Sequence, residues 1–297
     1  MAAIMTIFAA GFAGAQQSDI SPERKIADSL KYASGKIELG NNLATLNLPE
    51  GFRFLGPKDA QTVLTQLWGN PPGGELPMGM IVPANADVLT PGSWAILVTY
   101  EEDGHVKDDD AASINYGDLL KEMQASSVEL NKEREKEGYE PVQIVGWAAS
   151  PRYDAAGKKL YWAKELEFGS DPEHTLNYNI RILGRTGVLV LNAIASTKEL
   201  PVIEQATPEL LAAVSFNPGS RYEDFNESTD KMAAYGIAAL VAGGVAAKAG
   251  LFKGLWLGIL AFKKFIIIGL IAVGAFIKNF FAKKKSPYVQ ENQEQQP

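Results

Sequence analysis

Apolar residues recur at every second position through the middle of the chain, as expected for half-buried strands. In segment 159–168, Leu160, Trp162, Leu166 and Phe168 alternate with more polar neighbours. The glycine-rich turn 184–187 joins two further segments of strand length, which is typical of an antiparallel hairpin. The predicted strands are 36–39, 43–48, 94–100, 142–149, 159–168, 176–183 and 188–195. The last four predict an antiparallel meander.

Apolar residues spaced three and four apart predict four helices between these strands. The predicted helices are 21–32, 57–68, 113–137 and 199–214. Ser21 followed by Pro22 has the pattern of an N-cap and first turn, and Pro208 is expected to restart the last helix. Strands and helices in this order predict an α+β fold, an antiparallel sheet with flanking helices, over residues 16–225.

The stretch 231–285 near the end of the chain has a different composition, apolar residues interrupted by lysines and no acid. Residues 232–252 carry a single charge, Lys248, and are close to the roughly 20 residues that a helix needs to cross a bilayer. Lys248 lies near one end, where a long side chain can reach the interface. We therefore expect a C-terminal transmembrane helix at 232–252.

A second membrane-associated helix is expected at 253–285. Lys263 and Lys264 lie at the centre of its apolar part, and each would cost about 2.5–3.5 kcal/mol to insert. Lys253, Lys263, Lys264 and Lys278 fall on one side of a helix, which favours a helix lying in the interface, with a second crossing as the alternative. One crossing would leave the polar tail 286–297 in the cytoplasm.

Glycines spaced by four residues in the tail suggest close packing of membrane helices. Gly250, Gly254 and Gly258 have this spacing, which lets two helix backbones approach. Self-association through this face is expected, although glycine is also simply common in membrane helices.

The first 15 residues form a short apolar run that ends in Ala13-Gly14-Ala15, the small-x-small pattern of a signal-peptide cleavage site. No lysine or arginine precedes the run, so an apolar N-terminal tail is the alternative. We predict a signal peptide at 1–15 and a domain outside the cytoplasm.

Charge is divided unevenly along the 297 residues. Residues 16–230 hold 19 basic and 33 acidic side chains, whereas residues 231–297 hold 9 basic and 2 acidic ones. An acidic front domain would be repelled by phosphate backbones, so no nucleic-acid partner is expected. The chain has no cysteine, which excludes disulfides, thiolate metal sites and cysteine nucleophiles.

Candidate chemistry in the front domain is sparse. The acidic run 101–110 could offer oxygen ligands to a cation, but it lacks the calcium-loop pattern, and a solvated loop is the simpler interpretation. His105 and His174 are the two histidines, with no nucleophile motif beside them, and both are expected at the surface. A glycoside-cleaving site, in which two carboxylates act on a sugar that stacks on tryptophans, is a further alternative. Trp94 and Trp162 nevertheless fit the buried face of a strand better. No cofactor or metal is expected, and the catalytic residues are unknown.

Several stretches of the chain resemble one family. They are 46–55 (LNLPEGFRFL), Asn177-Tyr178 with 183–189 (LGRTGVL), 216–225 and 235–247. In this order they are similar to an uncharacterised family of predicted membrane-anchored bacterial proteins, domain of unknown function number twenty-one sixty-seven. The resemblance implies a bacterial envelope protein and supplies no activity. More loosely, the meander followed by a helix resembles the PsbP and Mog1-like sandwich.

The expectation is thus an inner-membrane protein whose periplasmic or other extracytoplasmic domain binds an envelope partner or ligand. The first alternative is an envelope hydrolase acting on a glycan or lipid. The second is a structural membrane protein that oligomerises through its glycine-rich helix. A cleft with converging titratable groups near His105 or His174 would favour the hydrolase.

Overall fold

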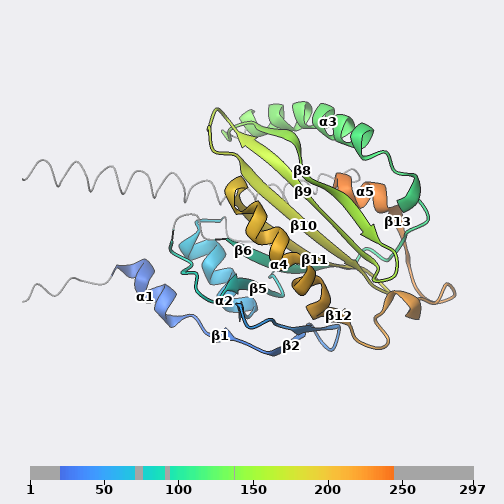
Figure 1. The fold of residues 1–297 in the computed structure, drawn as a ribbon, viewed down its shortest axis with the longest axis horizontal. Coiled ribbons are helices and arrows are strands. Elements are labelled where there is room, and N and C mark those ends of the chain that lie inside the picture. Colours follow the sequence, from blue (N-terminus) through green and yellow to red (C-terminus); the bar gives the residue numbers. More distant parts are fainter. Residues whose placement is uncertain (1–20, 71–75, 91–93, 137, 244–297) are drawn as a thin grey trace, which may run out of the picture.

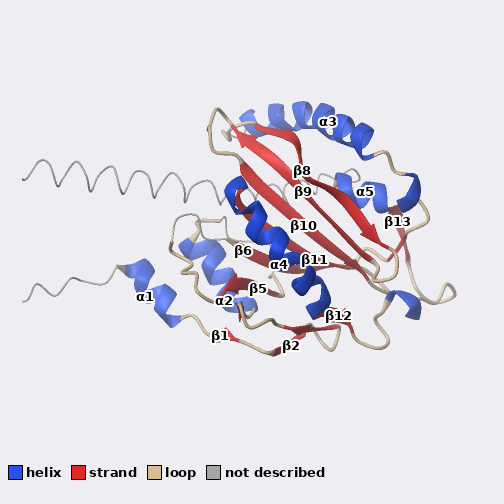
Figure 2. Ribbon diagram, viewed as in Figure 1, coloured by secondary structure: helices blue, strands red, loops and turns tan. Residues whose placement is uncertain are grey.

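The fold is built around an eight-stranded antiparallel sheet, as the computed structural model of the chain shows (Figures 1 and 2). The structure describes residues 21–70, 76–90, 94–136 and 138–243. The strand order of the sheet is β1-β4-β5-β6-β11-β10-β9-β8. A three-stranded sheet, β12-β3-β2, and a parallel pair, β13-β7, complete the strands of the described residues.

The predicted meander forms one half of the large sheet. Its strands are β8 (Val142–Asp154), β9 (Lys159–Phe168), β10 (Thr175–Leu183) and β11 (Val188–Ser196). In this register Arg181 lies opposite Leu160 and Val190, and Asn179 lies opposite Trp162 and Asn192. Side chains directly opposite each other share one face of the sheet. The prediction of four antiparallel strands is confirmed.

The N-terminal part supplies the other half of the large sheet. It consists of β1 (Tyr32–Ala33), β4 (Phe52–Leu55), β5 (Gly79–Pro83) and β6 (Ala95–Glu101). The small sheet consists of β2 (Lys36–Leu39), β3 (Ala44–Asn47) and β12 (Val214–Phe216). Gly40 and Asn42 have φ of 64° and 56° in the turn between β2 and β3, a conformation that glycine and asparagine tolerate. Strands β4 and β5 were not predicted, because each is short and lies in proline- or glycine-rich sequence. The predicted helix 21–32 is too long, because α1 ends at Ser29 and Tyr32 belongs to β1.

Helices cover both faces of the large sheet. They are α1 (Pro22–Ser29), α2 (Pro57–Thr62) with a π-helical turn (Val63–Leu67), α3 (Tyr116–Lys136) and α4 (Leu200–Ala213). Ser21 caps α1 as predicted, its hydroxyl accepting a hydrogen bond from the Arg24 amide. Pro208 lies inside α4 rather than restarting it.

The two faces of the sheet have different covers. Helix α4 and the small sheet lie on one face, where Leu176, Tyr178 and Ile180 of β10 join Ile203 and Leu210 of the helix in the main core. Helix α3 and the C-terminal helix α5 (Ile237–Ala242) lie on the opposite face. We call this second face the α3–α5 face.

The end of the described chain corrects the predicted membrane helix at 232–252. Residues Met232–Gly236 form strand β13, which runs parallel to β7 (His105–Lys107), and α5 ends at Ala242, followed by Gly243 with φ of 106°. Ala233, Ile237, Leu240 and Val241 are buried in the core of the α3–α5 face. A transmembrane helix therefore does not start at Met232, because these apolar residues pack against the domain. No helix within the described ranges has the length and hydropathy to span a bilayer.

Candidate functional site

A band of polar side chains crosses the α3–α5 face between two apolar clusters. It consists of Lys164 on β9, Asn177, Asn179 and Arg181 on β10, and Asn192 on β11, and we call it the polar band. On one side lies a cluster that includes Trp162 and Val190, and on the other a cluster that includes Leu166 and Ile194. Polar groups between two apolar clusters are costly unless they have partners.

Arg181 is the most unusual member of the polar band. The residue is 5 % exposed, its Nε has no hydrogen-bond partner in the structure, and its Nη1 makes one long bond of 3.4 Å to the Ile180 carbonyl. The guanidinium lies over the Trp162 ring, 5.3 Å from the ring centroid. The indole Nε1 of Trp162 is also buried without an acceptor. Two buried N–H donors on adjacent strands thus lack a partner.

No carboxylate forms an ion pair with the two cations of the polar band among the residues that the structure describes. Burial lowers the pKa of Arg181, and the nearby charge of Glu101 opposes this effect. Burial also lowers the pKa of Lys164, to about 8, with a further contribution from the positive charge of Arg181. Lys164 is partly exposed, so solvent reaches this end of the band.

The three asparagines form a short hydrogen-bonded ladder. Asn179 Nδ2 donates to Asn177 Oδ1 at 2.8 Å, and Asn177 Nδ2 donates to Asn192 Oδ1 at 2.9 Å. The ladder fixes the amide orientations, because each donor finds an acceptor on its neighbour. The three amides thus form a continuous polar surface across β10 and β11.

The sequence did not reveal the polar band. Asn177, Asn179 and Arg181 alternate with apolar residues, which is also the pattern of a solvent-facing strand. The sequence did contain one signal, the apolar residues on the two strands next to β10. They indicate that the sheet face carrying the polar band is covered. Using this signal requires the register between the strands.

A second candidate lies at the other end of the meander, around His174. Its Nδ1 lies 2.6 Å from Glu165 Oε1, and a shallow cavity of about 430 Å³ is lined by Pro172, Glu173, His174, Thr197 and Lys198. Glu173 Oε1 accepts hydrogen bonds from Ser196 Oγ and from Lys198 Nζ. The carboxylate orients the imidazole, but no hydroxyl donates to it within the described ranges.

His105 has a structural role, which corrects the expectation that both histidines lie at the surface. The residue is 6 % exposed, and its ring lies 4.0 Å from Phe225 and 4.2 Å from Tyr222 between centroids. Burial lowers its pKa, so the ring is neutral at pH 7. The histidine is thus a core side chain on β7.

The acidic run 101–110 holds the C-terminal segment against the domain. Asp103 accepts a 2.7 Å hydrogen bond from the Tyr235 hydroxyl, and Asp110 accepts bonds of 3.0 Å from the amides of Ile237 and Ala238 at the start of α5. Asp108 accepts from Lys158, Tyr153 and Tyr222. No group of metal-ligating side chains is found in the described part of the chain.

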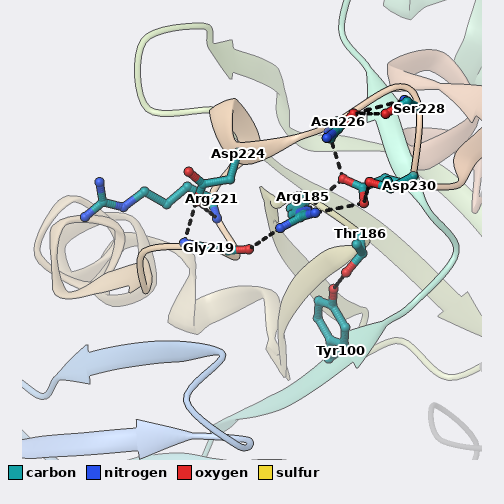
Figure 3. A network of polar contacts seen from close by, with 10 residues as sticks. Tyr100, Arg185, Thr186, Gly219, Arg221, Asp224, Asn226, Ser228 and Asp230 are labelled. Carbon is teal, nitrogen blue, oxygen red and sulfur yellow. Dashed lines mark hydrogen bonds and ion pairs between the residues drawn. The ribbon is translucent and has the colours of Figure 1, made fainter.

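Arg185, in the turn between β10 and β11, fixes the connection that precedes β13 (Figure 3). Its Nε and Nη2 donate to both carboxylate oxygens of Asp230 at 2.7 and 2.9 Å, and its Nη1 donates to the Gly219 carbonyl. The bidentate ion pair holds the pKa of Asp230 well below its usual range. The turn is a hairpin, as predicted, and it anchors the end of the domain.

The predicted residues of the tail lie outside the described residues. These are the helix-packing residues Gly250, Gly254 and Gly258 and the membrane-interface residues Lys248, Lys253, Lys263, Lys264 and Lys278. The signal peptide 1–15 also lies outside them. Trp94 and Trp162 are 7 % and 1 % exposed, which confirms their expected core positions.

Comparison with solved structures finds distant similarity at low TM-scores. PsbP of Synechocystis sp. PCC 6803 is 9 % identical, covering 63 % of this chain and 92 % of that one, with a TM-score of 0.32. The Ran-binding protein Mog1p of Saccharomyces cerevisiae is 11 % identical over 63 % and 96 %, with a TM-score of 0.33. LpqN of Mycobacterium tuberculosis, described as involved in cell envelope biogenesis, is 14 % identical over 68 % and 99 %, with a TM-score of 0.32. No curated protein matches the chain.

The family comparison covers most of the chain. A family model described as "Protein of unknown function (DUF2167)" matches residues 31–274. The match includes the four stretches that carry the resemblance, and it continues past Gly243 into the apolar tail. The chain therefore belongs to the DUF2167 family of proteins of unknown function.

Proposed function

We propose that this chain is an extracytoplasmic domain held at the bacterial inner membrane by residues after 243, and that it binds an envelope ligand or partner. The observation that carries the binding role is Arg181, a buried cation whose Nε lacks an acceptor. Buried charges in proteins are normally paired, so an unpaired one on a covered sheet face is a candidate for binding a ligand.

The anchoring role is supported by the composition of the tail and by the attachment of the segment before it. Residues 244–285 are apolar residues and lysines without an acid. The Arg185–Asp230 ion pair and the Asp110 contacts to α5 fix the chain up to its last described turn. A bilayer-bound tail would therefore hold the domain close to the membrane surface.

Fractionation and protease protection test the location. Full-length protein should sediment with membranes, and its domain should be cut by protease added to spheroplasts. A chain ending at Gly243 should be released into the soluble fraction. Full-length protein in the supernatant, or a domain protected in spheroplasts, would contradict the proposal.

An envelope hydrolase is the second candidate, favoured by the His174–Glu165 pair beside a cavity. The carboxylate would orient the imidazole to act as a general base on water or on a substrate hydroxyl. His174→Gln should then abolish release of products from envelope glycans or lipids, whereas His105→Gln should act only through stability. Equal activity of His174→Gln and the parent would remove this candidate.

A structural role through oligomerisation is the third candidate. It rests on the spacing of Gly250, Gly254 and Gly258 in the sequence. Gly254→Leu should reduce crosslinking between full-length chains in membranes, because leucine keeps two helix backbones apart. Unchanged crosslinking would argue against packing through this face.

A further inference from the structure

Two buried N–H donors at the polar band, one on Arg181 and one on the neighbouring Trp162, have no acceptor in the structure. Lys164 has no ion pair within the described ranges. The oxygens of Asn177 and Asn192 already accept hydrogen bonds from the asparagine ladder. A group that brings several acceptor oxygens and negative charge would satisfy this set.

Charge favours the same class of occupant. Lys164 and Arg181 act on each other as like charges on one covered face. Glu101, on β6 of the same face, acts on Arg181 through its charge alone and accepts no hydrogen bond from it. A water molecule could satisfy a donor, but it would add no negative charge beside the two cations.

The outer members of the polar band are partly exposed. Lys164 and Asn192 are partly exposed, whereas Asn177, Asn179 and Arg181 are each 5 % exposed or less. Helix α5 passes over this face, since Ile237 and Leu240 pack in the Trp162 cluster while Ala242 packs in the cluster of Leu166. A ligand would enter beside Lys164, the cation at the partly exposed end of the band.

We propose that the polar band is a binding site for an oxyanion, a carboxylate or phosphate group, held by Arg181 and Lys164 with the Trp162 indole as a further donor. The guanidinium presents a planar fork that matches both groups, and the ammonium contributes a point charge at the open end. The inference names a ligand class for the binding role proposed above and rests on that role. The oxyanion can belong to a free solute or to a lipid headgroup.

The test uses full-length protein in zwitterionic detergent at pH 7. The midpoint of thermal unfolding is followed as inorganic phosphate or acetate replaces chloride at constant ionic strength. A ligand of the native state raises the midpoint in a saturable way. A parallel series in nanodiscs compares phosphatidylglycerol with phosphatidylcholine, so that a headgroup ligand is distinguished from a free anion.

Three variants of equal charge change make the result specific. Arg181→Met and Lys164→Met should each weaken binding at least tenfold, whereas Lys121→Met, on the exposed side of α3, should bind as the parent does. Arg181→Met should unfold no earlier than the parent without added anion, because a buried unpaired charge is replaced by an apolar side chain of similar length. A variant that binds weakly for lack of folding would therefore be recognised.

Labelling of lysines gives a second measurement that is independent of stability. An amine-acylating reagent is applied at pH 8, and modification of Lys164 and Lys121 is compared by mass spectrometry. Bound anion should slow labelling of Lys164 several-fold and leave Lys121 unchanged. Parental binding in both Met variants would overturn the inference, as would the absence of any response to phosphate, acetate and anionic lipid.

The outcome is separable from the proposed location. Arg181→Met should still sediment with membranes, because the tail is intact. Absence of any anion response in the parent protein, with normal sedimentation, would remove the oxyanion site alone. Failure of the parent to sediment would remove the anchoring proposal and leave the anion measurement standing.

Discussion

The carboxylates of the acidic run 101–110 differ in the number of hydrogen bonds that they accept. Asp108 receives three side-chain hydrogen bonds, whereas its neighbour Asp109 is exposed and receives none that the structure records. Burial alone would raise the pKa of Asp108, but the bonds from Lys158, Tyr153 and Tyr222 outweigh burial and lower the pKa to about 2. The ionised form is thus favoured in the native state.

Asp108 should make the protein sensitive to acid. Its native pKa of about 2 lies below the ordinary 3.8, so its contribution is complete above pH 4 and is lost as the pH falls toward 2. Asp108→Asn should lower the free energy of unfolding at pH 7 by about 2 kcal/mol and flatten the acid limb. Urea unfolding between pH 2.5 and pH 7 measures both effects, with Asp109→Asn as the control of equal charge change. A similar loss in the two variants would contradict the assignment.

Lys164 should make the free energy of unfolding depend on pH in the alkaline range. Its native pKa of about 8 lies below the ordinary 10.5, so the unfolded chain binds more protons between these values and stability rises with pH there. The parent should gain about 1 to 3 kcal/mol from pH 8 to pH 10.5 relative to Lys164→Met. Denaturant unfolding of both proteins at three pH values measures the difference. Parallel pH profiles would show that Lys164 is not desolvated in the native state.

At the scale of elements, helix α5 depends on a side chain far away in the sequence. Asp110 accepts from the first amides of α5, and a Cβ on Gly236 would lie 2.9 Å from its carboxylate oxygens. A carboxylate at this position also interacts favourably with the helix dipole. The short helix therefore requires both the aspartate and the glycine.

Asp110→Ala should weaken α5 in particular. Loss of a helix cap costs about 1 kcal/mol, and the amides of Ile237 and Ala238 would lose their acceptor. Hydrogen exchange of the α5 amides should accelerate about fivefold, with β9 and β10 unchanged. Asp109→Ala is the matched control. Equal protection of α5 in both variants would exclude the capping role.

The end of the domain should tolerate truncation at one position and not at another. A chain ending at Gly243 keeps β13 and α5, whereas a chain ending at Lys231 loses the buried Ala233, Ile237, Leu240 and Val241. Losing these side chains should cost at least about 5 kcal/mol, since each large one contributes about 2 kcal/mol or more. Near-ultraviolet circular dichroism should be native for the first chain and reduced for the second. Native spectra for both would show that β13 and α5 are dispensable.

At the scale of the whole molecule, the sequence predicted the fold class and most long elements. Periodicity identified β9, α3 and α4 because each is long, although the apolar residues Val128 of α3 and Val202 of α4 are exposed. It missed β7 and β13, since their pairing joins segments more than a hundred residues apart and local pattern carries no such information. Composition also assigned the apolar residues 232–242 to a membrane, although burial against a sheet favours the same residue types.

The polar band was beyond prediction for a related reason. Each of Lys164, Arg181 and Asn192 lies on a different strand, and only the register places them together. An arginine on a strand normally faces solvent. Only the helices that pack on the same face show that Arg181 is buried. The site is thus a property of topology and of burial, whereas the histidine-based candidates came from residue type alone.

The pairing of β13 with β7 has a consequence for biogenesis. The amide of Ile237 meets Asp110 across 127 positions of sequence, so the α3–α5 face stays open until almost the entire domain has been synthesised. Until then, Trp162 and its apolar neighbours on this face lack the cover that β13 and α5 provide. If the tail enters a bilayer as proposed, the fold is completed only shortly before the tail is delivered there.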